Sequence, residues 1–216
     1  MKYLKFIMGL VVMVTSLTLS SALHAEIISA HSFGLTAYAY ASDEVYDGDM
    51  QTGTSIDVFW EESEQRTGRG ATDAYSNSHI YYNAYTWNGL EEIGCNGFAN
   101  ATDWSLDRLE SATASATLTL SCYKINSETG EYVELEPREI NVYVSLEGIG
   151  SVTRGRDSYN FVDPPNYHST YSHNGRSREA VPMFFIDGLS FAPSSGGSIY
   201  GELDEGRSNI TYKYVP

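Results

Sequence analysis

The stretch 111-SATASATLTLSC-122 decides the fold of this chain. Ala, Leu and finally Cys122 alternate with Ser and Thr without interruption. A period of two places one set of side chains on each face of an extended strand, and it is typical of a half-buried antiparallel strand. The stretch therefore predicts a β-sheet with one apolar face, and it places Cys122 on that face.

The same alternation recurs along the chain, with turn residues between the segments. Asn88-Gly89 and Asp187-Gly188 are tight-hairpin signals because these residue types tolerate a positive φ. Roughly ten short strands separated by turns predict an all-β fold, a single antiparallel β-sandwich or jelly-roll-like domain. An outer-membrane barrel is the alternative all-β fold. The strands have few large outward-facing apolar residues and no pair of aromatic girdles, which favours the sandwich.

Three polar stretches interrupt this alternation and are predicted to be long loops. They are residues 42–54, which are acidic, residues 62–72, which are charged, and residues 155–174, which are rich in Tyr and His. The run 204–206, Asp-Glu-Gly, has the composition of a further turn. Long loops in a compact domain are usually functional or disordered, so candidate sites are sought there.

Residues 1–25 have the three parts of a secretory signal peptide. Lys2 and Lys5 come first, an apolar run from Phe6 follows, and Ala22 and Ala25 are both acceptable cleavage positions. The apolar run, near 14 residues, is shorter than the roughly 20 needed to span a bilayer. We therefore expect a secreted or periplasmic protein whose mature part, residues 26–216, is one domain without a transmembrane segment.

The chain is strongly acidic, with a formal net charge of −15. Removal of the two signal-peptide lysines leaves about −17, by the formal charges of the side chains. Nucleic acids and anionic membrane surfaces select basic proteins, so no nucleic-acid partner is expected.

Cys95 and Cys122 are the only two cysteines. In an oxidising compartment an even count predicts a disulfide, and the inward position of Cys122 suggests a bridge across the core. Two buried free thiols are the alternative.

One segment, residues 154–178, is locally basic and aromatic. Arginine forks beside aromatic faces suit carboxylate, phosphate or sugar ligands, so we treat this segment as the candidate ligand-binding site. A network of structural ion pairs is the alternative. The candidate binding residues are Arg154, Arg156, His168, Tyr171, His173, Arg176 and Arg178.

The acidic stretch supplies the candidate metal ligands Asp43, Glu44, Asp47 and Asp49. Ca²⁺ binds several hard oxygen ligands on a flexible loop, and it is the possible cofactor here. The spacing does not match an EF-hand, and a solvated acidic loop is the alternative.

Common catalytic motifs are absent, including G-x-S-x-G, H-E-x-x-H and the phosphate-binding glycine patterns. A glycosidase-type carboxylate pair is the remaining catalytic possibility, drawn from Asp57, Glu61, Glu62, Glu91 and Glu92.

The sequence thus favours an exported, non-catalytic binding or cell-surface and matrix module, with a glycan or surface partner. A carbohydrate-active enzyme with a carboxylate pair and a self-assembling structural subunit are the alternatives. The subunit would need an uncovered edge strand.

Overall fold

The structure, a computed structural model, describes residues 26–68, 70, 72–163 and 167–214. The predicted signal peptide lies outside these ranges. Every regular element within them is a β-strand, which confirms the all-β prediction, and none is a helix that could cross a membrane. The strands are β1 (Glu26–Asp47), β2 (Met50–Thr67), β3 (Thr72–Trp87), β4 (Glu91–Asn100), β5 (Asp103–Asp107), β6 (Ser111–Asn126), β7 (Tyr132–Gly148), β8 (Thr153–Asp163), β9 (Tyr167–Ile186), β10 (Leu189–Phe191) and β11 (Ser198–Tyr214).

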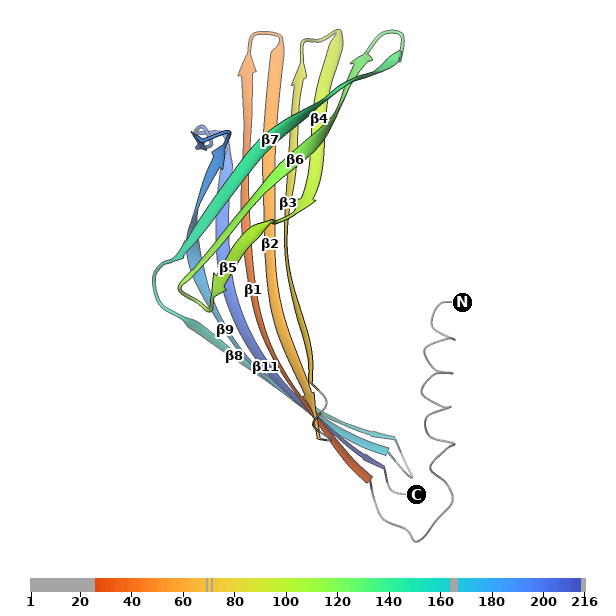
Figure 1. Ribbon diagram of the computed structural model, residues 1–216, viewed down its shortest axis with the longest axis vertical. Coiled ribbons are helices and arrows are strands. Elements are labelled where there is room, and N and C mark those ends of the chain that lie inside the picture. Colours follow the sequence, from red (N-terminus) through yellow and green to blue (C-terminus); the bar gives the residue numbers. More distant parts are fainter. Residues whose placement is uncertain (1–25, 69, 71, 164–166, 215–216) are drawn as a thin grey trace.

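The strands form one antiparallel sheet whose hydrogen bonds close into a ring. Around the ring the order is β1, β2, β3, β4, β6, β7, β9 and β11, and β11 pairs again with β1. β5, β8 and β10 are not part of the ring. The other strands are neighbours in the ring in the order in which they occur in the chain, which is an up-and-down meander. In Figure 1, β6 and β7 run diagonally across β1, β2 and β3.

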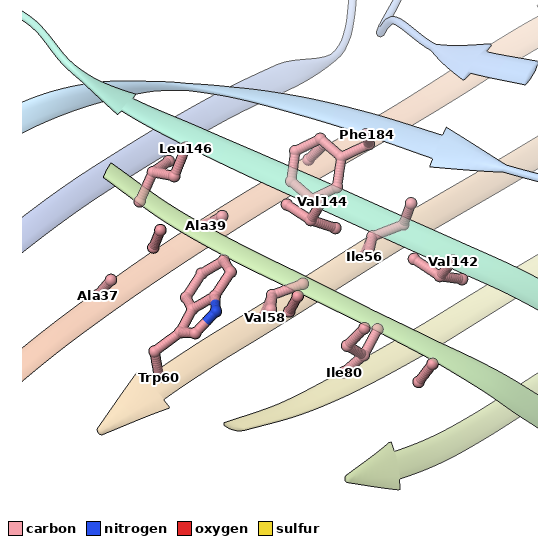
Figure 2. Close-up of a cluster of buried hydrophobic side chains, with 14 of the residues drawn as sticks. Ala37, Ala39, Ile56, Val58, Trp60, Ile80, Val142, Val144, Leu146 and Phe184 are labelled. Atoms are coloured by element: carbon pink, nitrogen blue, oxygen red, sulfur yellow. The ribbon is translucent and has the colours of Figure 1, made fainter. Parts of the chain in front are cut away.

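The core fills the inside of this ring. Along β6 the buried positions alternate as the sequence predicts. Trp60 of β2 is fully buried and donates its indole N–H to the Thr113 carbonyl oxygen of β6, 2.7 Å away. Figure 2 shows Trp60 beside Val58, with Val144 and Leu146 on a strand that crosses above them. The apolar faces of the crossing strands therefore meet inside the ring.

Six strands continue beyond the ring as one sheet, which we call the extension. β4 pairs with β3 only from His79 onward, and β7 pairs with β9 only from Ala180 onward. Across the extension the order is β3, β2, β1, β11, β9 and β8. Figure 1 shows these strands curving away below the part where β6 and β7 cross them.

Among the described residues, the extension ends on both sides in edge strands that are paired on one side only. β8 pairs with β9 along its whole length, and its residues 153–162 are all exposed. At the other side, β3 has no neighbour from β4 before His79 in the described part of the chain. Such edges can accept a further strand, which is the feature that the self-assembly alternative requires.

The three predicted long loops are largely strands, so that prediction was wrong. β1 and β2 leave only residues 48 and 49 between them, and β2 continues to Thr67. Residues 155–163 of β8 pair with residues 167–175 of β9. The alternation rule detects strands with one buried face. It fails in the hairpin tips and the extension because polar residues can occupy both faces of a strand there.

Cys95 of β4 and Cys122 of β6 form the predicted disulfide. The two residues are register partners on neighbouring strands, with Cα atoms 4.1 Å apart. The bridge therefore lies within the sheet, and the expectation that it crosses the core was wrong. Register partners on neighbouring strands have Cα atoms close enough for a disulfide. Residues on opposite sides of a core are too far apart to be bridged.

Candidate functional site

Four glycines stand side by side across four neighbouring strands of the extension. Gly34 of β1 pairs with Gly206 of β11, Gly206 with Gly175 of β9, and Gly175 with Gly155 of β8. Register partners in an antiparallel sheet point to the same face. These four positions therefore add no side chain of their own to one face, along a line about 14 Å long at roughly 4.8 Å for each strand spacing.

Neither backbone conformation nor crowding accounts for all four glycines. None of the four has a φ in the left-handed region. A Cβ on Gly155 would meet no atom within 4 Å, and one on Gly34 would meet only the Glu62 carbonyl oxygen, at 3.8 Å. A larger residue would fit the fold at these two positions, but its side chain would cover the bare face.

The bare face is the floor of a cavity of about 510 Å³, which we call the glycine trough. Beside the glycines, on the same face, lies a row of register partners with hydroxyl and carboxyl groups. The row consists of Thr36, Asp204, Ser177 and Thr153, all of which line the cavity. One wall of the trough is therefore polar along its whole length.

His173 forms part of the opposite wall. Its ring lies over the floor, because a Cβ on Gly206 would be 2.9 Å from its Cε1 and one on Gly175 would be 3.2 Å from its Nε2. The Nδ1 atom is 2.8 Å from the Ser208 Oγ. This hydrogen bond fixes the orientation of the imidazole ring, so that the Nε2 atom faces the floor of the trough.

Two tyrosines extend this wall away from the trough. Tyr171 and Tyr159 are register partners on β9 and β8, and their rings stack with centroids 4.8 Å apart. Tyr171 is also parallel to the His173 ring, with centroids 6.4 Å apart. Tyr159 is 59% exposed. Together they form an accessible aromatic platform, which we call the tyrosine platform.

Asp204 is the carboxyl group of the trough with a perturbed pKa. Partial burial raises its pKa from the usual 3.8 to about 6, and the nearby Glu202 carboxylate adds to the rise. Glu202 is two residues earlier on β11, so it points to the same face, and it accepts a hydrogen bond from the Tyr200 hydroxyl. Near pH 6, Asp204 can therefore donate as well as accept a hydrogen bond.

The arginines next to the trough belong mainly to the other face of the sheet. Arg154, Arg176 and Glu205 border the cavity, but strand alternation directs their side chains away from the glycine face, so their backbone completes the floor. Arg176 forms an ion pair with Glu205, which is only 5% exposed. Arg207 lies 3.9 Å from the same carboxylate.

The seven predicted binding residues do not converge on one pocket. His173 lines the glycine trough, Tyr171 lies beyond it on the same face of the sheet, and Arg154 and Arg176 only border it. Arg178 forms an ion pair with Glu110. The remaining two, both exposed and both on the face opposite to His173, are Arg156 and His168.

The four predicted metal ligands lie at the β1–β2 hairpin tip. Hydrogen bonds from Ser194, at 2.6 and 3.0 Å, lower the pKa of Asp43, and a hydrogen bond from the Tyr85 hydroxyl lowers that of Glu44. Adjacent residues on a strand point to opposite faces, so these two carboxylates do not share a centre. Within the described ranges no group of three potential metal ligands is found. The calcium site stays a prediction.

Several carboxylates considered for a hydrolytic pair have partners of their own. Asp57 accepts a hydrogen bond from the Tyr38 hydroxyl at 2.7 Å, and Glu91 forms an ion pair with Lys124 at 2.6 Å. Glu61 is the register partner of Thr36, so it continues the polar wall of the glycine trough onto β2.

Neither the glycine row nor the role of Asp204 is evident from the amino-acid sequence alone. Gly34 looks like one small residue inside an alternating segment, and Asp204 looks like part of a turn. Only the strand register shows that the glycines share a face. Glycine at the outward position of several adjacent strands is the signal that would have found the trough, and it requires the pairing to be known first.

No protein-family model matches this chain, and no curated protein sequence is similar to it. Among solved structures, it is weakly similar to the outer membrane protease OmpT from Escherichia coli. That match has 10% identity, covers 91% of this chain and 99% of that one, and has a TM-score of 0.22. The translocator domain of the autotransporter NalP from Neisseria meningitidis gives 8% identity, coverage of 92% and 91%, and a TM-score of 0.13. Likeness at this level carries no argument about function.

Proposed function

We propose that this chain is an exported, non-catalytic binding module of the cell surface or matrix, and that the glycine trough binds a neutral glycan. One observation carries the proposal: Gly34 and Gly155 leave both ends of the floor, on either side of the His173 ring, free of side chains although the fold has room for one at both positions. Glycine within a strand often marks a place where a ligand approaches the backbone closely.

The groups around the floor suit a ligand rich in hydroxyls. The hydroxyls of Thr36, Ser177 and Thr153 can each donate and accept hydrogen bonds. The tyrosine platform beside His173 offers aromatic faces on which the apolar face of a sugar ring can stack. The side chains of Arg154 and Arg176 point away from the trough and Asp204 lies in its wall, so the trough itself disfavours an anionic ligand. A neutral polymer lying across the strands fits these conditions.

Export is part of the same proposal. Residues 1–25 have the composition of a signal peptide. The disulfide between Cys95 and Cys122 is the kind of bond that persists in oxidising compartments.

The test is titration of the mature, oxidised protein with a panel of soluble neutral polysaccharides, followed by calorimetry. The variant Gly155→Gln adds a side chain to the floor where nothing obstructs it. We expect it to weaken binding about tenfold or more, by displacing the ligand, while the melting temperature does not fall.

Ser158→Gln is the matched control because Ser158 is exposed on the opposite face of the same strand. It should bind like the unmodified protein. Full binding by Gly155→Gln, or an equal loss in both variants, would show that the trough is not the site.

A glycoside hydrolase is the second candidate, and one observation favours it. Asp204, whose pKa is raised to about 6, and Glu202 lie on the same face of β11 beside the trough, and glycosidases use two carboxyl groups as acid and base. Release of reducing ends from a bound polysaccharide, lost in Asp204→Asn, would establish this function. Binding without any release would support the non-catalytic module.

A further inference from the structure

A second cavity lies inside the ring, at the end that carries the β1–β2, β3–β4 and β6–β7 hairpins. Its volume is about 240 Å³. Thr54, Tyr82 and Leu120 each lie two residues from a fully buried core residue on the same strand. The cavity therefore sits directly on top of the core, at one mouth of the ring, and we call it the mouth cavity.

The walls of the mouth cavity come from six strands. They combine five aliphatic side chains and one face of the disulfide, through Cys95, with the hydroxyl groups of Thr52, Thr54 and Thr86. The apolar wall residues are Ala84, Ile93, Leu120, Ile140 and Ile186. Ile93 is 44% exposed, so the apolar lining reaches the rim. Pockets of this composition, with a few placed polar groups, are typical of sites for small amphipathic molecules.

One positive charge points into this apolar mouth. Arg138 of β7 lines the cavity and is the register partner of Leu120. Arg138 faces inward because it is two residues before the buried Ile140 on the same strand. A β-bulge follows on the side of the β6–β7 hairpin, where Leu135 pairs with Cys122 and two residues of β7 lie opposite one residue of β6.

The Arg138 guanidinium has no ion-pair partner within 4.0 Å among the described residues. Asp187 is a neighbouring acid, but it accepts the Asn141 backbone N–H at 2.8 Å. Tyr82 lies close enough for the guanidinium to act on it: burial raises the pKa of the Tyr82 hydroxyl, and the charge of Arg138 opposes that rise. An exposed arginine above an apolar cavity can thus still bind an anion.

We propose that the mouth cavity binds a small amphipathic carboxylate, with its apolar chain against Leu120, Ile140 and Ile186 and its carboxylate on Arg138. A planar guanidinium binds a carboxylate with two parallel hydrogen bonds. At about 30 Å³ for each water-sized group, the volume corresponds to roughly eight such groups, which matches a medium-length fatty acid. This site is separate from the glycine trough.

The experiment compares octanoate with 1-octanol, which has the same chain length and no charge. Calorimetric titration of the mature, oxidised protein should show octanoate binding more tightly than octanol. Arg138→Gln should weaken octanoate about tenfold, the effect of one charge-assisted contact, and leave octanol unchanged.

Two further variants keep the test decisive. Arg156→Gln removes an exposed arginine outside the cavity and should bind octanoate normally. Ala84→Leu adds a side chain to the cavity wall and should weaken both ligands. Equal binding of octanoate and octanol by the unmodified protein, or full octanoate binding by Arg138→Gln, would overturn the proposal.

Discussion

Gly206 lies directly beneath the imidazole ring of His173, so closely that a Cβ at position 206 would be 2.9 Å from the ring carbon Cε1. The ring can approach the floor of the glycine trough this closely only because position 206 has no side chain. The orientation of His173 also depends on Ser208, whose Oγ is 2.8 Å from Nδ1. A substitution at position 206, in the floor of the trough, should therefore also move His173, in its wall.

Gly206→Ala should displace the His173 ring and weaken its hydrogen bond to Ser208. The added methyl group must push the ring aside, and overpacking of this kind costs about 1–3 kcal/mol of unfolding free energy. Because the ring is the end of a side chain, we expect a value near the lower limit. Urea denaturation gives the free energy, and the imidazole NMR shifts report the displacement.

Gly155→Ala is the control, because the new Cβ meets no atom within 4 Å and the φ of Gly155 is not left-handed. It should be neutral or stabilise the fold by up to about 1 kcal/mol, through the lower entropy of the unfolded chain. Equal destabilisation by both substitutions would contradict the coupling between Gly206 and His173.

The disulfide gives the second prediction. Replacing Cys95 and Cys122 by Ser should lower the unfolding free energy by about 3.5 kcal/mol, because a loop closed across 27 residues loses its constraint in the unfolded state. Cys122 also belongs to the buried core, so its hydroxyl replacement adds to the loss. Denaturant curves of the oxidised protein and the double variant measure the difference.

Reduction of the unmodified protein is the control for that substitution. It breaks the same bond but keeps the sulfur atoms in place, so it should account for most of the loss. A double variant as stable as the oxidised protein would contradict the prediction. An intact mass unchanged by reduction would show that the two cysteines are not bridged.

How far the sequence predicts the structure depends on whether a strand has one buried face. The alternation in residues 111–122 predicts β6 and the inward position of Cys122, and both are confirmed. When alternate residues of a strand are buried, apolar residues recur at every second position of the sequence. β8 carries no such pattern because all its residues from 153 to 162 are exposed, and the sequence therefore predicts a loop over most of it.

The candidate site was harder to predict than the fold, because it arises from pairing. His173 and Tyr171 were identified from their local composition, and both lie on the trough face. Arg176 was identified by the same reasoning, but it points to the opposite face, where Glu205 neutralises it. The local composition shows that aromatic and charged residues gather in one segment. Only strand alternation decides to which face of the sheet each side chain points.

Asp204 gives a prediction about pH. Its pKa is raised to about 6 in the folded state, against 3.8 when it is exposed. Between these values the folded protein holds a proton that the unfolded chain has lost, so this group makes stability fall as pH rises from about 4 to about 6. Below about pH 4, Asp204 is protonated in both states and does not change the free energy of unfolding with pH. Above about pH 6, its contribution to stability has been lost completely.

Asp204→Asn should remove this contribution. The variant and the unmodified protein should melt at similar temperatures near pH 4, and the variant should melt higher above pH 6. Ser177→Ala, a change in the same wall without a titrating group, should give a difference that does not vary with pH. A constant gap between Asp204→Asn and the unmodified protein from pH 4 to 7 would contradict the assignment.

Arg176 tests whether the arginine-rich segment is structural or binds ligand. Its partner Glu205 is 5% exposed, so Arg176→Gln leaves a buried carboxylate with only the more distant Arg207, at 3.9 Å. Loss of one member of a buried pair is strongly destabilising, and partial exposure of the arginine reduces the effect to about 1–3 kcal/mol. Urea denaturation measures it.

The companion variant Glu205→Gln separates the loss of the ion pair from the cost of an unpaired buried carboxylate. It removes the buried charge itself, so the double variant Arg176→Gln, Glu205→Gln should recover much of the stability lost in Arg176→Gln alone. Arg156→Gln, at an exposed position, should change the unfolding free energy by less than about 0.5 kcal/mol. If Arg176→Gln leaves stability unchanged but weakens glycan binding, then Arg176 acts on the ligand, and its pairing with Glu205 is not what holds it in this position.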